Sequence, residues 1–109
     1  MFLLAALTLI AVASFLFVRA QLDPGAPVAG VTAITVRDNE FAPAAVAVSV
    51  GTELTWRWAG EAEHNVIGDG FPSPVQAAGE IVHRFAAPGS YDYQCTLHTF
   101  MRGRVVVTE

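Results

Sequence analysis

The chain contains no lysine, so its six basic residues are all arginines. Ten acidic residues outnumber them, and the net charge is −4 at pH 7. A protein that binds nucleic acid usually presents a basic patch or stripe that neutralises phosphates. These scattered arginines form no such run in the sequence, which therefore argues against a nucleic-acid partner, and the mild acidity disfavours other polyanions.

Cysteine occurs only once, at Cys95, so the chain cannot form an internal disulfide. A lone cysteine is a buried thiol, an intermolecular link, or a reactive or metal-binding thiol. Taken by itself, Cys95 would be interpreted as a buried thiol. However, His98 follows it by three positions and Met101 follows by three more. These neighbours favour the metal-binding interpretation.

Helical periodicity of useful length is missing after residue 30, and alternation of apolar and polar residues takes its place. The alternating segments are residues 31–37, 46–50, 53–58, 80–85, 91–95 and 104–109. Several short strands with turn residues between them predict an all-β sandwich or small barrel. Residues 68–79 are expected to form an irregular connection with room for a turn of helix.

One long apolar run precedes the strands, from Phe2 to Val18. A run this uniform lacks the polar face that an ordinary buried helix turns to water. We therefore interpret residues 1–20 as a signal peptide or an N-terminal membrane anchor, and we favour a cleaved signal. Either interpretation predicts an exported, periplasmic domain, which an anchor would hold on the outer face of the inner membrane.

The segment after this leader, residues 21–30, is rich in proline, glycine and alanine. Such a composition predicts an extended, mobile linker. The remaining residues, 31–109, are enough for one small domain with a single core.

A further candidate metal ligand, His64, lies at the end of the segment that follows the tryptophan-containing strand. Strand ends gather at one pole of a sandwich, so His64 can meet the loop of residues 95–101. The set would then be two imidazoles, a thiolate and a thioether. Soft sulfur ligands favour copper, and a His₂Cys plane with a weak axial methionine is typical of blue-copper electron-transfer sites. Zinc prefers four firm ligands, and a thioether is a poor fourth.

Three stretches together resemble the cupredoxins and, among them, most of all the amicyanins. They are "YDYQCTLHTFMRGRVVV" (91–107), "FAPAAVAVSVGTELTW" (41–56) and "HNV" (64–66). The Cys-x-x-His-x-x-Met spacing is specific, because plastocyanins, pseudoazurins and azurins have longer spacings in this loop. The resemblance covers roughly residues 31–109.

This resemblance implies a cupredoxin-like Greek-key β-sandwich of about seven or eight strands that binds one copper ion. It implies strong ligation by His64, Cys95 and His98, with Met101 as the axial ligand. It also implies that Asn65 ties the two ligand loops together, with Thr96 as its partner. The expected function is one-electron transfer between Cu(II) and Cu(I), with no substrate bond made or broken.

In the same family the edge of the second histidine reaches the surface within an apolar patch that docks partners. Here the exit would be His98, surrounded by Leu97, Phe100 and Phe71. The resemblance implies a monomer that meets redox proteins, such as an amine dehydrogenase and a c-type cytochrome. Small, weak interfaces suit partners that must separate quickly.

The chain departs from the amicyanins where Leu97 and Thr99 replace prolines on either side of His98. The family's redox potential and the protonation behaviour of its exposed histidine are therefore not transferred. A copper-dependent enzyme is disfavoured, since the chain has neither a second histidine cluster nor the second cysteine of a binuclear centre. A periplasmic copper carrier uses the same ligands and remains the alternative function.

Overall fold

A computed structural model describes residues 22–109, and the predicted leader lies outside these residues. Ten strands form within the described part of the chain. They are β1 (Val28–Ala29), β2 (Ala33–Val36), β3 (Phe41–Ala42), β4 (Ala45–Ser49), β5 (Glu53–Trp58), β6 (Ile67–Gly68), β7 (Phe71–Pro72), β8 (Gly79–Arg84), β9 (Gly89–Gln94) and β10 (Arg102–Thr108).

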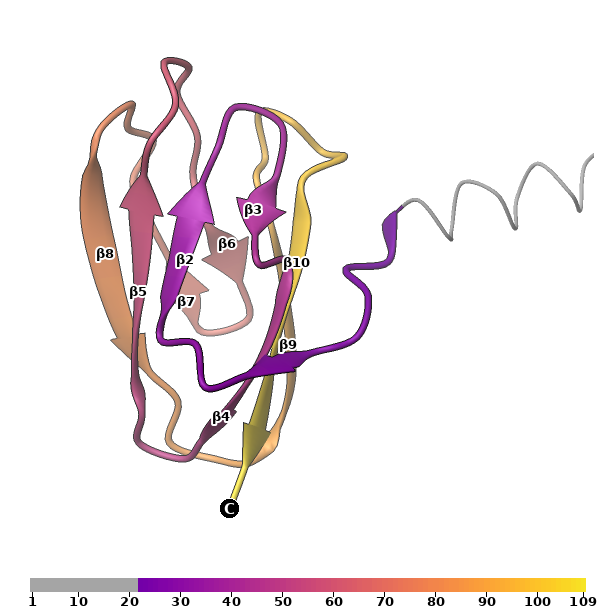
Figure 1. The fold of residues 1–109 in the computed structure, drawn as a ribbon. Helices are drawn as coiled ribbons and strands as arrows, with labels where there is room; N and C mark the ends of the chain where they lie inside the picture. The colour runs from indigo at the N-terminus through magenta and orange to yellow at the C-terminus, as the bar shows by residue number, and fades with distance from the viewer. Residues whose placement is uncertain (1–21) are drawn as a thin grey trace, which may run out of the picture.

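Two sheets make up the fold (Figure 1). One sheet has six strands in the order β1-β4-β10-β9-β6-β7, and the other has four in the order β3-β2-β5-β8. Both sheets are mixed: β4 runs parallel to β1 and β10, and β2 runs parallel to β5, while the other pairs are antiparallel. The predicted all-β sandwich is confirmed.

The number of strands exceeds the predicted seven or eight because β1, β3, β6 and β7 have only two residues each. A two-residue strand shows no alternation, so the sequence pattern could not reveal it. The connection of residues 68–79 contains no turn of helix. The start of that segment pairs as the hairpin of β6 and β7 instead.

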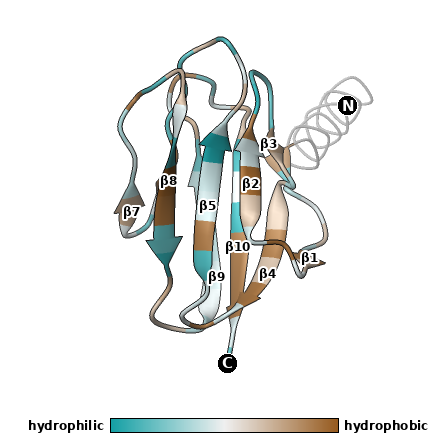
Figure 2. Cartoon of the chain, turned by 60° about the vertical axis from the view of Figure 1, so that its left-hand side comes forward, coloured by the Kyte–Doolittle hydropathy of each residue, from teal (hydrophilic) through white to brown (hydrophobic). Residues whose placement is uncertain are grey.

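The core lies between the sheets and follows the predicted alternation. Along β5, Leu54, Trp56 and Trp58 point inward and are 0%, 0% and 6% exposed. Ile34 and Val36 of β2 are buried in the same core cluster. Figure 2 shows the resulting bands of hydrophobic and hydrophilic residues along β5 and β8. Alternating burial of this kind is what a sheet with one solvated face requires.

The segment predicted as a linker reaches the sheet at its end. Val28 and Ala29 pair in parallel with Val46 and Ala47 of β4, so ordered pairing begins before residue 31. Within residues 22–109, no helix is long and apolar enough to cross a membrane.

Loops gather at one pole of the sandwich, at the top of Figure 1. They include the β2–β3 turn, the β5–β6 loop, the β7–β8 loop and the β9–β10 loop, and the C-terminus lies at the opposite pole. Residues far apart in the sequence therefore meet at this pole, which carries the candidate site.

Candidate metal centre

Three side chains converge at the loop pole: His64 from the β5–β6 loop, and Cys95 and His98 from the β9–β10 loop. The Cys95 Sγ atom lies 3.7 Å from Nδ1 of His64 and 3.7 Å from Nδ1 of His98. The two Nδ1 atoms are 3.1 Å apart. Both imidazoles therefore turn the same ring nitrogen toward the thiol.

This triangle of donor atoms has the size that one metal ion requires. Bonds of about 2.0–2.1 Å to nitrogen and about 2.3 Å to sulfur, in a trigonal plane, would put the nitrogens about 3.5 Å apart and each about 3.8 Å from the sulfur. The observed separations of 3.1 and 3.7 Å are close to these values. The residues present thus fit a first-row metal, and the thiolate–imidazole set suits copper.

The β9–β10 loop folds back on itself around these donors. The backbone N–H of Cys95 donates to the carbonyl of Met101 at 3.2 Å, and the N–H of Met101 donates to the carbonyl of His98 at 2.8 Å. Cys95 and Met101 are both fully buried, whereas His98 is half-buried. The predicted axial residue is therefore held beneath the surface in the same short loop as two of the donors.

Backbone contacts hold His64 in place from several sides. Its N–H and carbonyl exchange hydrogen bonds of 3.0 Å with the backbone of Gln76. The indole Nε1–H of Trp58 also donates to the His64 carbonyl at 3.1 Å. His64 is 0% exposed. Burial of these polar groups without partners would be costly, and these bonds satisfy the backbone N–H and carbonyl of His64.

The far side of the His64 ring meets a carboxylate that the sequence reasoning missed. Nε2 of His64 lies 3.2 Å from Oδ1 of Asp38, in the β2–β3 turn. The same carboxylate accepts hydrogen bonds from the backbone N–H groups of Glu61 and Ala62. These two backbone bonds, followed by the contact with His64, lower the pKa of Asp38 below its usual value.

Asn65 and Thr96 connect the two ligand-bearing loops. The side-chain amide of Asn65 donates from Nδ2 to Thr96 Oγ1 at 2.8 Å. In return, the backbone N–H of Thr96 donates to Asn65 Oδ1 at 2.8 Å. The structure thus joins the positions directly after His64 and Cys95, which is the tie that the resemblance implies.

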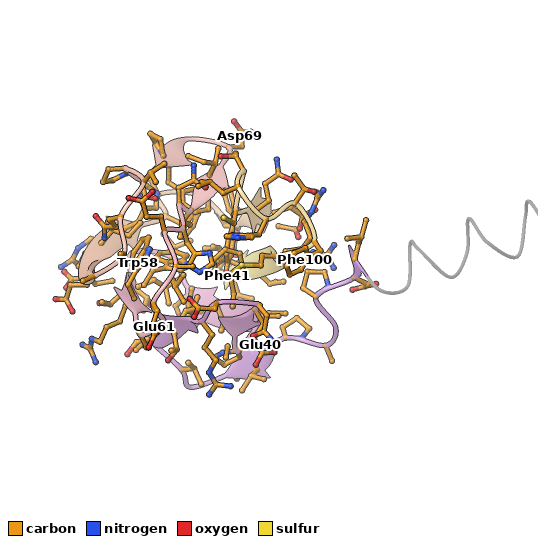
Figure 3. The ribbon with its side chains drawn as sticks, turned by 90° about the horizontal axis from the view of Figure 1, so that it is seen from above. Glu40, Phe41, Trp58, Glu61, Asp69 and Phe100 are labelled. Atoms are coloured by element: carbon orange, nitrogen blue, oxygen red, sulfur yellow. The ribbon has the colours of Figure 1, made fainter. Side chains whose placement is uncertain are left out.

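The predicted docking residues separate into two groups. Leu97 and Phe100 are 45% and 56% exposed beside the half-buried His98, and Figure 3 shows Phe100 on the side of the pole toward the segment that precedes β1. Phe71, in contrast, is only 3% exposed. Its ring packs against those of Trp56 and Tyr93, with centroid separations of 5.6 and 5.8 Å. The assignment of Phe71 to a docking surface is therefore wrong, since β7 points this ring into the core.

Comparisons with known proteins agree with this geometry. Residues 29–108 match the family described as copper binding proteins, plastocyanin/azurin family. Amicyanin-alpha from Methylorubrum extorquens is 35% identical over 89 residues, which cover 72% of this chain and 73% of that protein.

Solved structures are similar as well. A reduced tryptophan-to-tyrosine variant of amicyanin has a TM-score of 0.66 at 29% identity, over 72% of this chain and 83% of that one. A purple cupredoxin from Nitrosopumilus maritimus has a TM-score of 0.65 at 24% identity, covering 72% of this chain and all (100%) of that one, which is a likeness of fold. The matching amicyanin structures include a Cu(I) form and an oxidized form.

The family match extends over most of the described residues, and the donor triangle fits the cofactor that the family is named for. The chain belongs to the plastocyanin/azurin family of copper-binding proteins, and within it the chain is similar to amicyanin.

Proposed function

We propose that the protein is a type 1 copper electron-transfer protein. The observation that carries this proposal is the triangle of His64, Cys95 and His98 donor atoms, with Met101 buried in the same loop as Cys95 and His98. In the proposed site His64, Cys95 and His98 would hold the copper strongly, and Met101 would be a further, weaker ligand. Bound copper would supply the one-electron Cu(II)/Cu(I) chemistry.

The protein's own contribution is to keep the donor atoms in one arrangement. His64 is fixed by Gln76, Trp58 and Asp38, and the Asn65–Thr96 pair joins its loop to the loop of the other donors. A scaffold that changes little between oxidation states leaves little to reorganise at each transfer. Exclusion of water by the buried Cys95 and Met101 has the same effect.

The route for the electron is proposed to pass through His98. This residue is the most exposed of the three donors, and the apolar side chains of Leu97 and Phe100 lie beside it at the surface. A small apolar surface of this kind supports brief contacts with redox partners. An amine dehydrogenase and a c-type cytochrome are the partners that the similarity to amicyanin suggests.

Transport of copper as cargo is the alternative function, and burial argues against it. His64, Cys95 and Met101 are each 0% exposed, so release of the metal would require the β9–β10 loop to open. A carrier needs to hand over its metal, whereas an electron carrier needs to retain it. We further propose that the protein acts as a monomer, is not an enzyme, and works in the periplasm after export.

The test is to load the protein with Cu(II) and record the visible spectrum and a voltammogram. An intense blue absorption from the Cu(II)–thiolate bond and a reversible one-electron wave support electron transfer. Loading without the blue absorption contradicts the proposal. A blue protein that shows no reversible wave and passes copper to a chelator within minutes is a metal carrier instead.

A further inference from the structure

The Asp38 carboxylate is the point where the β2–β3 turn contacts the loop that carries His64. Its Oδ1 atom accepts from the N–H groups of Ala62 at 2.9 Å and Glu61 at 3.0 Å, and its Oδ2 atom lies 3.1 Å from the same Glu61 nitrogen. The remaining partner is Nε2 of His64, at 3.2 Å. In Figure 3, Glu61 and Glu40 mark this side of the pole, with Asp69 on the opposite side.

The loop is shaped to approach this carboxylate closely. A Cβ atom added to Gly60 would overlap with Asp38 Oδ1, so a larger residue there would force the loop and the carboxylate apart. Asp38 also has no competing cation: among the ion pairs of residues 22–109, its one partner is His64. The neighbouring Arg37 pairs with Glu40 instead, at 3.0 Å. The close approach at Gly60 and the lack of another cationic partner both favour the contact of Asp38 with His64.

This contact decides which nitrogen of the neutral His64 ring carries the proton. An ionised carboxylate only accepts hydrogen bonds, so Nε2 of His64 must be the N–H that faces it. Nδ1 is then left with its lone pair, aimed at the donor triangle. Without Asp38 the other tautomer becomes accessible, because Nδ1 of His98 lies 3.1 Å from Nδ1 of His64 and can accept its proton.

We propose that Asp38 is a positioning residue of the copper centre, which holds His64 in its ligand tautomer and lowers the reduction potential of the bound metal. The inference rests on the proposed function. A carboxylate hydrogen-bonded to a ligating imidazole raises the basicity of that ligand, and its negative charge stabilises Cu(II) more than Cu(I). Asp38 is 47% exposed, so this charge acts from the solvent side of a fully buried ring.

The first experiment compares Asp38→Asn with Glu40→Gln in the copper-loaded protein. Asparagine keeps an oxygen acceptor for the loop and for His64 but removes the charge. Glu40→Gln removes an equal charge from the same turn without touching the site. Loss of a residue that orients a ligand typically weakens metal binding about 10–100-fold. A tenfold loss confined to Cu(II) raises the one-electron potential by about 59 mV.

We therefore expect a rise of at least this size in Asp38→Asn, a much smaller rise in Glu40→Gln, and a potential near that of the unchanged protein in Asp38→Glu. Equal shifts in Asp38→Asn and Glu40→Gln would overturn the proposal, because they would reflect general charge rather than contact with His64.

The second experiment reads the His64 tautomer directly, by ¹⁵N NMR of the metal-free protein at neutral pH. The unchanged protein is expected to carry its proton on Nε2, and Asp38→Ala is expected to show a mixture or the Nδ1–H form. An unaltered Nε2–H tautomer in folded Asp38→Ala would overturn the positioning role. If Asp38→Ala does not fold, the reduction potential of Asp38→Asn tests the proposal instead. The NMR measurement needs no copper, so a failure of the proposed function is distinguishable from a failure of this inference.

Discussion

The two loops that supply the donor atoms are built in opposite ways. The His64 segment is buried, and its ring and backbone contact Gln76, Trp58 and Asp38. The β9–β10 loop is held mainly by bonds within itself, and Leu97 and Phe100 extend from it into solvent. One histidine is thus enclosed by the fold, while the other lies at the surface.

Because of this difference, the two loops can serve different roles at the metal centre. The enclosed loop can set the geometry and the potential, because the backbone and the ring of His64 have fixed partners. The exposed loop can contact other proteins, because its apolar side chains are exposed at the surface and do not pack in the core. Asn65 and Thr96 are the connection between the two, so movement in one loop is limited by the other. The following substitutions test how far the two loops differ.

The largest effect is expected for Cys95→Ser, which removes the thiolate that both loops surround. Serine is nearly isosteric, but its hydroxyl is not a soft ligand, so the intense blue absorption should disappear completely. The visible spectrum after copper loading measures this, and circular dichroism of the metal-free variant checks the fold. Retention of the blue band in Cys95→Ser would mean that another group binds the copper.

Replacing each histidine by glycine should separate the loops most clearly. Both variants lose a ligand and should bind copper weakly, but added imidazole can reach only a site that opens to solvent. Because His98 is half-buried and His64 is 0% exposed, imidazole should restore the blue spectrum in His98→Gly and not in His64→Gly. An imidazole titration followed by absorbance provides the comparison. Equal rescue of both variants would contradict the enclosure of His64.

Cutting the connection between the loops should have an intermediate effect. Asn65→Ala removes two hydrogen bonds of 2.8 Å and leaves the Thr96 N–H without its partner. At about 0.5–1.5 kcal/mol for each bond, the free energy of unfolding of the metal-free protein should fall by about 1–3 kcal/mol. Urea unfolding measures the change, and Asn39→Ala, at an exposed position in the β2–β3 turn, is the control. A loss no larger than that of the control would show that the tie contributes little.

Much of the fold and of the site is predictable because it depends on local patterns in the sequence. The alternation along β5 identifies Trp56 as a core residue, and the spacing of Cys95, His98 and Met101 places three donors in one short loop. His64 required an argument about strand ends meeting at a pole, and the structure brings it to the other donors.

What the sequence could not reveal depends on tertiary contacts between distant residues. Asp38 has the features of an ordinary turn residue, and only the parallel pairing of β2 with β5 brings its turn beside the His64 loop. The one signal in the sequence is that Asp38 is an acidic residue directly after the strand expected over residues 31–37. The prediction that Phe71 lies at the docking surface is wrong for a related reason: the unrecognised β6–β7 hairpin turns its side chain into the core.

The smallest expected effect is at Thr99, where the amicyanins usually have proline. The N–H of Met101 donates to the carbonyl of His98, so Thr99 is the second residue of this four-residue turn. Proline is favoured at that position because its ring presets the backbone angle that the turn needs. Thr99→Pro should therefore stabilise the metal-free protein by about 0.4–1 kcal/mol, through a loss of freedom in the unfolded chain. Urea unfolding beside Thr99→Ala, which removes the side chain without adding the ring, isolates this effect. Destabilisation by proline would mean that the backbone at Thr99 does not have the conformation that proline requires. Backbone flexibility of the exposed loop would then be a further difference from the enclosed His64 loop.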